Sequence, residues 1–335
     1  MGTHLDSNRL HAPRAVLVLG GSGFIGRHTV AALCASRCRV VIGTRYPSRI
    51  DDCLPPDARD CERRRVRFES TLTAAGWGSL LDGIDVVINC VGILRPRGRE
   101  TYERVHHIAP AALATACFER GRRLIHVSAL GLNEPARSGF LTSKRAGEEA
   151  IRTSGADCYI VRPSLLDGDG GFGAKWLRRV ARWPLHPLPA NLAGRVAALD
   201  VRDLGEALSR LALRPRNIDC DATDREFDLG GTHLRELSEH LAALRRLHTS
   251  RPAWRVPIPD LLARLGSHLC DLIHFSPYSF GHWELLRRDN CPERNRLPEL
   301  LGRAPRRVGL SDVAVEPVSL LPSAHDASTS IPFPE

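Results

Sequence analysis

The sequence predicts an α/β fold, in which a doubly wound parallel sheet is followed by a small C-terminal α/β lobe. Three observations lead to this prediction. Short apolar runs alternate with segments of helical periodicity, and such alternation requires parallel strands joined by right-handed crossovers. The first apolar run ends in a glycine cluster, GGSGFIG over residues 20–26, that opens a helix. The hydrophobic content of 43% is ample for the core that such a sheet needs.

The glycine cluster stands between a buried strand over 15–19 and a helix over 25–36. The free N–H groups at the start of a helix carry partial positive charge and bind phosphate groups. Gly20 allows the sharp turn, Gly23 lets a pyrophosphate approach the backbone, and Gly26 lets the helix pack against the strand. An ordinary strand–turn–helix corner needs one glycine rather than three, so we expect a dinucleotide site here.

The second strand, over 38–42, is followed by Gly43-Thr44-Arg45. NAD-binding units usually carry an acidic residue at this strand end, which accepts a hydrogen bond from the ribose 2′-hydroxyl. Here no carboxylate appears until Asp51, and Arg45 is placed to meet a 2′-phosphate with a planar, bidentate donor. Arg45 has two open interpretations, a phosphate ligand or one more surface arginine. The missing acid independently favours NADP(H), with NAD(H) as the less favoured cofactor.

The later elements continue the alternation. Residues 51–65 are polar and predict an irregular surface excursion, and 66–68 predict a short third strand. The elements that follow are strands over 85–92, 124–128 and 158–162 and helices over 104–119 and 142–154. The strand over 85–92 is almost wholly apolar, which is typical of the middle of a parallel sheet, and its end has to pass close beneath a cofactor.

Composition excludes several classes of protein. The net charge of +9 comes almost wholly from arginine, since Lys144 and Lys175 are the only lysines, and no pattern of stacking aromatics among basic residues predicts nucleic-acid binding. Ten cysteines occur without a CxxC pair, and several lie in apolar elements, so we expect buried thiols and no metal site. No run of about 18 apolar residues and no apolar signal core occur, which predicts a cytoplasmic protein.

With these elements placed, the chain resembles the short-chain dehydrogenase/reductase superfamily, in its extended or atypical branch. The matching motifs are GGSGFIG at 20–26, NCVG at 89–92, HVSALG at 126–131, Ser143-Lys144, RPS at 162–164, DVRDL at 200–204 and FDLGG at 227–231. The resemblance covers about residues 14 to 245. It is nearest to the group around the nucleotide-binding accessory subunit of respiratory complex I and its bacterial relatives, and to proteins of the epimerase/dehydratase type.

The resemblance implies an NADP(H)-binding Rossmann domain over 12–165, to which segments at about 195–230 return. It also implies a substrate lobe with C-terminal helices over 166–315. The cofactor-binding residues that it implies are Gly20, Ser22, Gly23, Phe24, Ile25, Gly26, Arg45, Cys90, Val91, Gly92, Lys144 and Pro163.

The catalytic positions depart from the family at one residue. In the family, a tyrosine four residues before the lysine is the general acid/base, the lysine lowers its pKa and holds the nicotinamide ribose, and a strand-end serine orients the substrate oxygen. Ser128 and Lys144 match these catalytic positions, but Phe140 stands in place of the tyrosine. Phenylalanine has no proton to give, and losing such a group typically slows a reaction by about 10²–10⁴-fold. A lysine kept in so arginine-rich a chain favours retained cofactor binding.

Two functions are compatible with these residues. The favoured one is a cofactor-stabilised scaffold, sensor or assembly factor without the usual redox step. The alternative is an active NADP-dependent oxidoreductase or epimerase, acting on a carbonyl, quinone or sugar-nucleotide substrate. Its proton would come from Tyr102, Tyr159, Asp167, Asp169 or a water held by Ser128. The expected partners are therefore the dinucleotide and a small-molecule or quinone-like ligand.

The C-terminal part begins with a glycine-rich loop over 167–173. A basic segment with two tryptophans, over 175–183, predicts a helix that packs within the lobe; the less favoured alternative is peripheral contact with a membrane, directly or through a partner. The remaining predicted elements are helices over 203–213, 234–247 and 258–275, a strand over 226–229 and a disordered tail over 316–335.

Overall fold

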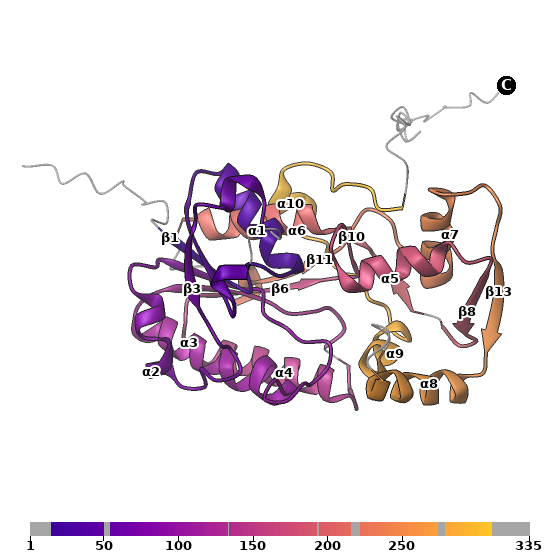
Figure 1. Cartoon of the computed structure of the whole chain (residues 1–335), viewed down its shortest axis with the longest axis horizontal. Coiled ribbons are helices and arrows are strands. Elements are labelled where there is room, and N and C mark those ends of the chain that lie inside the picture. Colours follow the sequence, from indigo (N-terminus) through magenta and orange to yellow (C-terminus); the bar gives the residue numbers. More distant parts are fainter. Residues whose placement is uncertain are drawn as a thin grey trace, which may run out of the picture.

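The computed structural model describes residues 15–49, 54–132, 134–192, 194–215, 222–273 and 279–309. The expected tail over 316–335 lies outside these residues. The described chain is built on a seven-stranded sheet in the order β11-β6-β5-β4-β1-β2-β3 (Figure 1). All of its neighbouring strands run parallel. The strand order reverses between β1 and β4, and ligands of such sheets bind at the carboxyl ends of the strands beside this reversal. The predicted doubly wound sheet is confirmed.

The strand bounds agree with the prediction to within a few residues, except at one edge. In chain order the strands of this sheet are β1 (Ala15–Leu19), β2 (Arg39–Thr44), β3 (Glu62–Arg65), β4 (Val86–Asn89), β5 (Arg123–Val127), β6 (Cys158–Pro163) and β11 (Glu226–Leu229). The strands β1, β2, β4, β5 and β6 are buried along nearly their whole length, as their apolar sequences require.

The third strand was predicted in the wrong place. It is formed by Glu62–Arg65, inside the stretch expected to be irregular, and Val66 and Phe68 follow it and are buried beside α2 and α3 instead. As an edge strand, β3 has a single neighbour and points charged side chains to solvent, so it carries no apolar pattern to read.

Two layers of helices cover the sheet. The helices flanking it are α1 (Phe24–Ala35), α2 (Ala74–Trp77), α3 (Ala109–Glu119), α4 (Gly139–Thr153), α6 (Val201–Leu213) and α10 (Leu297–Leu301), with a π-helical turn over Glu103–Ile108 leading into α3. Single 3₁₀ turns occupy Pro47–Arg49, Pro56–Ala58, Ser79–Leu81 and Ala222–Arg225. In Figure 1, α1, α6 and α10 lie above the sheet and α2, α3 and α4 below it.

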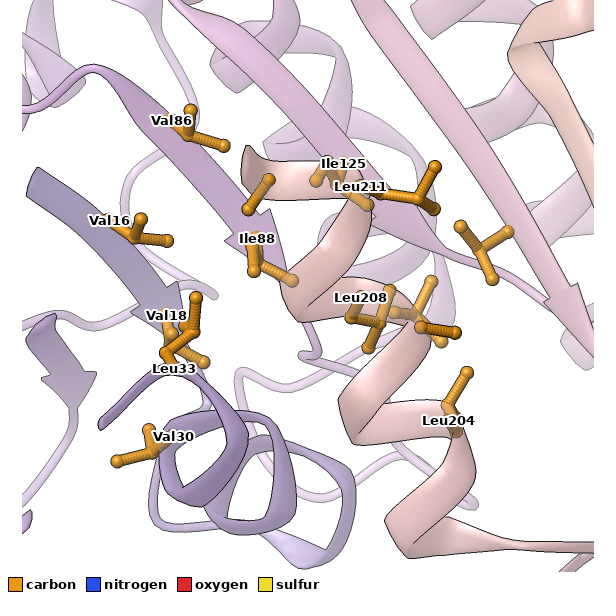
Figure 2. Packing of buried hydrophobic residues seen from close by; sticks show 14 of the residues in the cluster. Val16, Val18, Val30, Leu33, Val86, Ile88, Ile125, Leu204, Leu208 and Leu211 are labelled. Atoms are coloured by element: carbon orange, nitrogen blue, oxygen red, sulfur yellow. The ribbon is translucent and has the colours of Figure 1, made fainter. Parts of the chain in front are cut away.

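The packing of α1 and α6 on one face of the sheet forms a large part of the core. Figure 2 shows Val30 and Leu33 of α1 beside Leu204 and Leu208 of α6, against valines and isoleucines of β1, β4 and β5. The two helices approach closely at Gly205, where an added Cβ would lie 2.6 Å from the carbonyl oxygen of His28. This close approach fixes the start of α1, and with it the glycine turn.

The C-terminal lobe is built from short strand pairs and helices. Its elements are β7 (Leu166–Asp167), α5 (Phe172–Ala181), β8 (Leu185–Pro189), β9 (Arg195–Val196), β10 (Leu199–Asp200), β12 (Arg235–Glu236), α7 (Leu237–Arg246), β13 (Trp254–Ile258), α8 (Asp260–Ile273) and α9 (Phe280–Leu286). β7 pairs with β10, β8 with β13, and β9 with β12.

The basic tryptophan segment packs within the lobe, as expected. Val180 and Ala181 of α5 are buried against Leu241 and Leu244 of α7. Trp183 falls after the end of α5 and is exposed, so it does not share the packed face that the sequence had suggested. Among the described helices, none combines the length and the apolar character that crossing a bilayer requires.

Candidate functional site

The glycine turn between β1 and α1 has the geometry of a phosphate-binding loop. Gly20 has a positive φ of 71°, and the N–H of Gly23 donates to the Gly20 carbonyl at 2.8 Å. A Cβ on Gly26 would lie 2.2 Å from that same carbonyl oxygen, so any other residue would force the turn open. Gly23 is the N-cap of α1 and no side chain caps this helix, which leaves its first N–H groups to bind an anion.

The end of β4 lies directly against this turn. An added Cβ on Gly20 would meet Val91 Cγ2 at 3.2 Å and the Cys90 backbone at 3.4 Å. The Val91 N–H donates to Asn89 Oδ1 at 3.0 Å, which holds the chain close to the sheet as it leaves the strand. Burial raises the pKa of the Cys90 thiol to about 12, so this cysteine is a packing group and not a nucleophile.

A cavity of about 480 Å³ opens from the carboxyl ends of the strands toward the lobe. Most of its lining is apolar, and both the N-terminal sheet region and the C-terminal lobe contribute lining residues. The predicted site residues that line it are Gly23, Phe24, Ile25, Cys90, Gly92, Ser128, Phe140, Lys144 and Pro163. The lobe contributes apolar side chains of α5, α7 and α9, among them Phe172, Trp176, Leu177, Leu237, Leu285 and Leu286. Gly20, Ser22, Gly26, Arg45 and Val91 belong to the glycine turn and its surroundings and do not line the cavity.

The serine, the lysine and the phenylalanine predicted to lie together share this cavity. Ser128 is only 6% exposed, and its Oγ is buried with no hydrogen bond to any residue that the structure describes. Phe140 and Lys144 lie one turn apart on α4, with the Lys144 ammonium 5.7 Å from the centre of the Phe140 ring. Burial lowers the pKa of Lys144 to about 8, while the carboxylate of Glu148 acts in the opposite direction.

Phe140 belongs to an aromatic cluster. Its ring meets the rings of Tyr102 and His106 edge-on, at centroid distances of 5.9 and 5.5 Å, and stacks on His282 at 5.7 Å. His106 is a buried structural residue, because its Nδ1 lies 3.1 Å from Ser143 Oγ and its Nε2 accepts from the Ile93 N–H at 3.1 Å. It therefore ties the loop after β4 to α4.

His282 is a titratable cavity residue that the sequence did not predict. It lies on α9, where Ser279 Oγ accepts from the His282 N–H at 3.2 Å and lies 2.7 Å from the ring Nδ1. Burial lowers the pKa of His282 to about 4, so the imidazole is neutral near pH 7. No motif in the sequence marks this position, since it reaches the cavity only through the packing of α9 on the lobe.

The four side chains suggested as replacement proton donors do not line the cavity. Tyr159 is buried in the core, and the Tyr102 hydroxyl donates to the Leu94 carbonyl at 2.8 Å. Asp167 accepts from Nε and Nη2 of Arg178, while the Asp169 side chain is 97% exposed. Of the residues named in these suggestions, only Ser128 lines the cavity.

Arg45 stands at the end of β2 as predicted, but it has a partner that the sequence did not suggest. Its guanidinium forms a salt bridge with Glu100 and lies 5.9 Å from the centre of the Tyr46 ring. Ser22 Oγ lies 3.1 Å from Thr44 Oγ1, which joins the glycine turn to the same strand end. A carboxylate is therefore present beside this site, supplied by a distant loop instead of by β2 itself.

These features fit a dinucleotide. The glycine turn is a cradle that a single Cβ would fill, and the unpartnered Ser128 hydroxyl lies in the adjoining cavity. The parallel sheet, its reversal point and this turn define a nucleotide-binding protein of the Rossmann type.

Comparison with known proteins agrees with this class. Residues 20–178 match a family described as NAD(P)H-binding. The ceramide reductase of Caulobacter vibrioides is 33% identical over 201 residues, which cover 60% of this chain and 61% of that protein. The mitochondrial NADH dehydrogenase [ubiquinone] 1 alpha subcomplex subunit 9 of Rattus norvegicus is 27% identical over 320 residues, which cover 90% of this chain and 76% of that protein.

Solved structures show the same fold. A nucleoside-diphosphate-sugar epimerase from Staphylococcus aureus has a TM-score of 0.66 at 15% identity, covering 88% of this chain and 97% of its own. The UDP-glucuronic acid 4-epimerase of Bacillus cereus, solved with UDP-glucuronic acid and NAD, has a TM-score of 0.62 at 15% identity, covering 88% of this chain and 95% of its own. Residues 20–178 thus form an NAD(P)H-binding domain, and the whole chain has the Rossmann-type fold of these epimerases and resembles atypical members of the short-chain dehydrogenase/reductase superfamily.

Proposed function

We propose that the chain is an NAD(P)H-dependent reductase of a lipid-like carbonyl compound. The Ser128 hydroxyl carries this proposal, because it is buried in an apolar cavity with Lys144 and has no hydrogen-bond partner among the described residues. An unsatisfied buried hydroxyl costs about 1–3 kcal/mol, and a substrate carbonyl oxygen would satisfy it. The apolar lining suits an alkyl chain better than a sugar nucleotide. The 33% identity to a ceramide reductase over 60% of the chain supports the same class of substrate.

The cofactor would be held by the glycine turn and the start of α1 at its pyrophosphate, and by Lys144 at its nicotinamide ribose. NAD(P)H supplies a hydride when bound. We further propose a preference for NADP(H), in which Arg45 exchanges Glu100 for the 2′-phosphate. Glu100 could also accept a hydrogen bond from the ribose 2′-hydroxyl of NAD(H). The preference for NADP(H) therefore requires that the bond from Arg45 to the 2′-phosphate is stronger than the bond from the 2′-hydroxyl to Glu100.

Reduction of a carbonyl also needs a proton for the oxygen. Two cavity groups carry one, and their acidities decide between them. With a pKa of about 8, Lys144 is roughly 90% protonated at pH 7 and is close to the acidity that proton transfer favours. With a pKa of about 4, His282 is protonated in roughly 0.1% of molecules at pH 7. In this proposal Ser128 orients the oxygen, Lys144 gives it a proton, and solvent restores the lysine.

The test is NADPH oxidation with a series of methyl ketones of increasing chain length. Each buried methylene contributes about 0.8 kcal/mol, so kcat/KM should rise about fourfold per carbon until the cavity is filled. Ser128→Ala should lower kcat/KM at least a hundredfold and change NADPH affinity less than twofold. Ser36→Ala, on the exposed end of α1, is the matched control. No dependence on chain length, or full activity of Ser128→Ala, would refute the proposal.

A second candidate function is a cofactor-stabilised scaffold or assembly partner. Phe140 favours it, because the family's usual acid/base is absent from this position. The 27% identity to a complex I subunit over 90% of the chain also supports it. This candidate predicts that NADPH raises the Tm of the protein while no ketone in the series accelerates NADPH oxidation.

A further inference from the structure

The helix α8 presents its largest apolar side chains to solvent. Leu261, Leu262, Leu265 and Leu269 are 67%, 57%, 56% and 55% exposed, and their spacing places them on one face of the helix. In Figure 1, α8 lies at the lower edge of the molecule beside α9. We call these four side chains the α8 leucine face.

The side of α8 that packs against the protein is made of small residues. Ala263 is 8% exposed and Ser267 is fully buried, with the Ser267 hydroxyl donating to the Arg264 carbonyl at 2.6 Å. A helix that needed only to complete the lobe would bury its leucines and expose its small residues. In α8 the small residues are buried and the leucines are exposed, so the leucines form an apolar surface that the described protein does not cover.

The charges on α8 leave an excess of positive charge beside the leucine face. Asp260 lies 3.7 Å from the Arg287 guanidinium, and Asp271 lies 2.9 Å from that of Arg95. Both carboxylates are thereby neutralised. Arg264, between the leucines along the helix, is exposed, and its guanidinium packs 5.9 Å from the centre of the Phe280 ring. The face thus combines apolar side chains with a cation and complements an anionic, apolar surface.

We propose that the α8 leucine face docks the protein on the surface of a bilayer that contains anionic lipids. The leucine side chains match the acyl layer of a bilayer, and the exposed Arg264 beside them matches its anionic headgroups, which is the combination found in interfacial helices. Arg264 adds one positive charge beside the leucine face, and this charge attracts anionic headgroups. A helix of 14 residues is about 21 Å long, too short to span a bilayer, so it would lie in the interface.

The placement of α8 gives docking a consequence for the cavity. α8 packs on α9, and α9 supplies His282, Leu285 and Leu286 to the cavity lining. The docked face is therefore one helix removed from the cavity. An apolar ligand dissolved in the bilayer would enter from the side of the lobe. Docking itself needs neither cofactor nor turnover, so it stands apart from the reductase proposal.

The test is co-sedimentation of the full-length protein with phosphatidylcholine vesicles, with and without 30% phosphatidylglycerol. We expect binding to the anionic vesicles that weakens as salt is added. Leu265→Glu with Leu269→Glu should reduce the partition coefficient at least tenfold. The matched control is Phe118→Glu with Leu247→Glu, which changes two similarly exposed apolar side chains outside α8. Arg264→Gln should reduce the difference between anionic and neutral vesicles.

Three outcomes would overturn this inference. One is absence of binding to either vesicle by the unaltered protein. Another is equal binding by the α8 double variant and the control variant. The third is a dimer in sedimentation velocity that the α8 double variant dissociates, which would assign the leucine face to a second copy of the chain. NADPH affinity of the double variant, expected to be unchanged within twofold, shows that its fold is intact.

Discussion

Lys144 should destabilise the protein that contains it. Burial lowers its pKa from 10.5 to about 8, so at pH 7 the folded state holds a proton that its surroundings disfavour. At about 1.4 kcal/mol per pK unit, this corresponds to about 3 kcal/mol of lost stability. The cation–π contact of the ammonium with the Phe140 ring stabilises the folded state by about 1 kcal/mol and offsets part of this loss. Replacing the lysine by methionine, which keeps the length of the side chain, should therefore raise the free energy of unfolding at pH 7 by about 2 kcal/mol.

The pH dependence gives the sign of the effect independently. Between about pH 8 and 10.5 the unfolded chain binds more protons than the folded one at this site, so the stability of the unaltered protein rises with pH relative to Lys144→Met. The advantage of the variant should shrink to below about 1 kcal/mol at pH 10. Urea unfolding at pH 7, 8.5 and 10 measures this, with Lys175→Met, which removes the exposed lysine, as the control. A variant that is less stable at pH 7, or whose advantage does not change with pH, would refute the reasoning.

Three further predictions concern cofactor and chemistry. Phe140→Tyr should raise ketone-dependent NADPH oxidation at least tenfold, because it restores a hydroxyl beside the Lys144 ammonium. The Kd for NADPH, measured by calorimetry, should stay within twofold of its original value. An unchanged rate of oxidation would contradict this prediction. Arg45→Ala should weaken NADP(H) binding at least tenfold, or about 1.4 kcal/mol, and Glu100→Gln should strengthen it, since the carboxylate competes for the guanidinium; equal losses for NAD(H) would count against a role at the 2′-phosphate. Gly26→Ala should weaken binding of both cofactors at least tenfold and lower the Tm, because its Cβ would lie 2.2 Å from the Gly20 carbonyl oxygen; retention of cofactor affinity would show that the turn can open.

The central sheet could be predicted because buried parallel strands have nearly continuous apolar sequences. The order and type of its elements followed from those runs and from the glycines after β1. The one misplaced strand, β3, has the sequence Glu-Arg-Arg-Arg and pairs with β2 along one edge, so its position depends on polar contacts that leave no apolar pattern in the sequence. The lobe was less readable, since β8 is a proline-containing segment that pairs with β13 across a long separation in sequence.

The candidate site was predictable where one strand end or one helix turn supplies it. Ser128, Phe140 and Lys144 come together because a strand end and adjacent turns of α4 meet at the same sheet edge. His282 and Glu100 were missed for the opposite reason. Each reaches the site from a segment distant in sequence, so no local spacing encodes it. The end of β2 itself carries no carboxylate, as the sequence indicated, but Glu100 brings one to Arg45 from a distant loop.

The pairing of β8 with β13 is also the part of the lobe that protects its backbone least. β13 is exposed at four of its five residues and β8 at two of its five, whereas β1 and β4 are buried at every residue. Because separating β8 from β13 uncovers little apolar surface, we expect the lobe to open before the sheet does. Amide hydrogens of β8 and β13 should therefore exchange faster than those of β1 and β4. The cavity has one wall in each part, so its rate of opening is set by the less protected of the two.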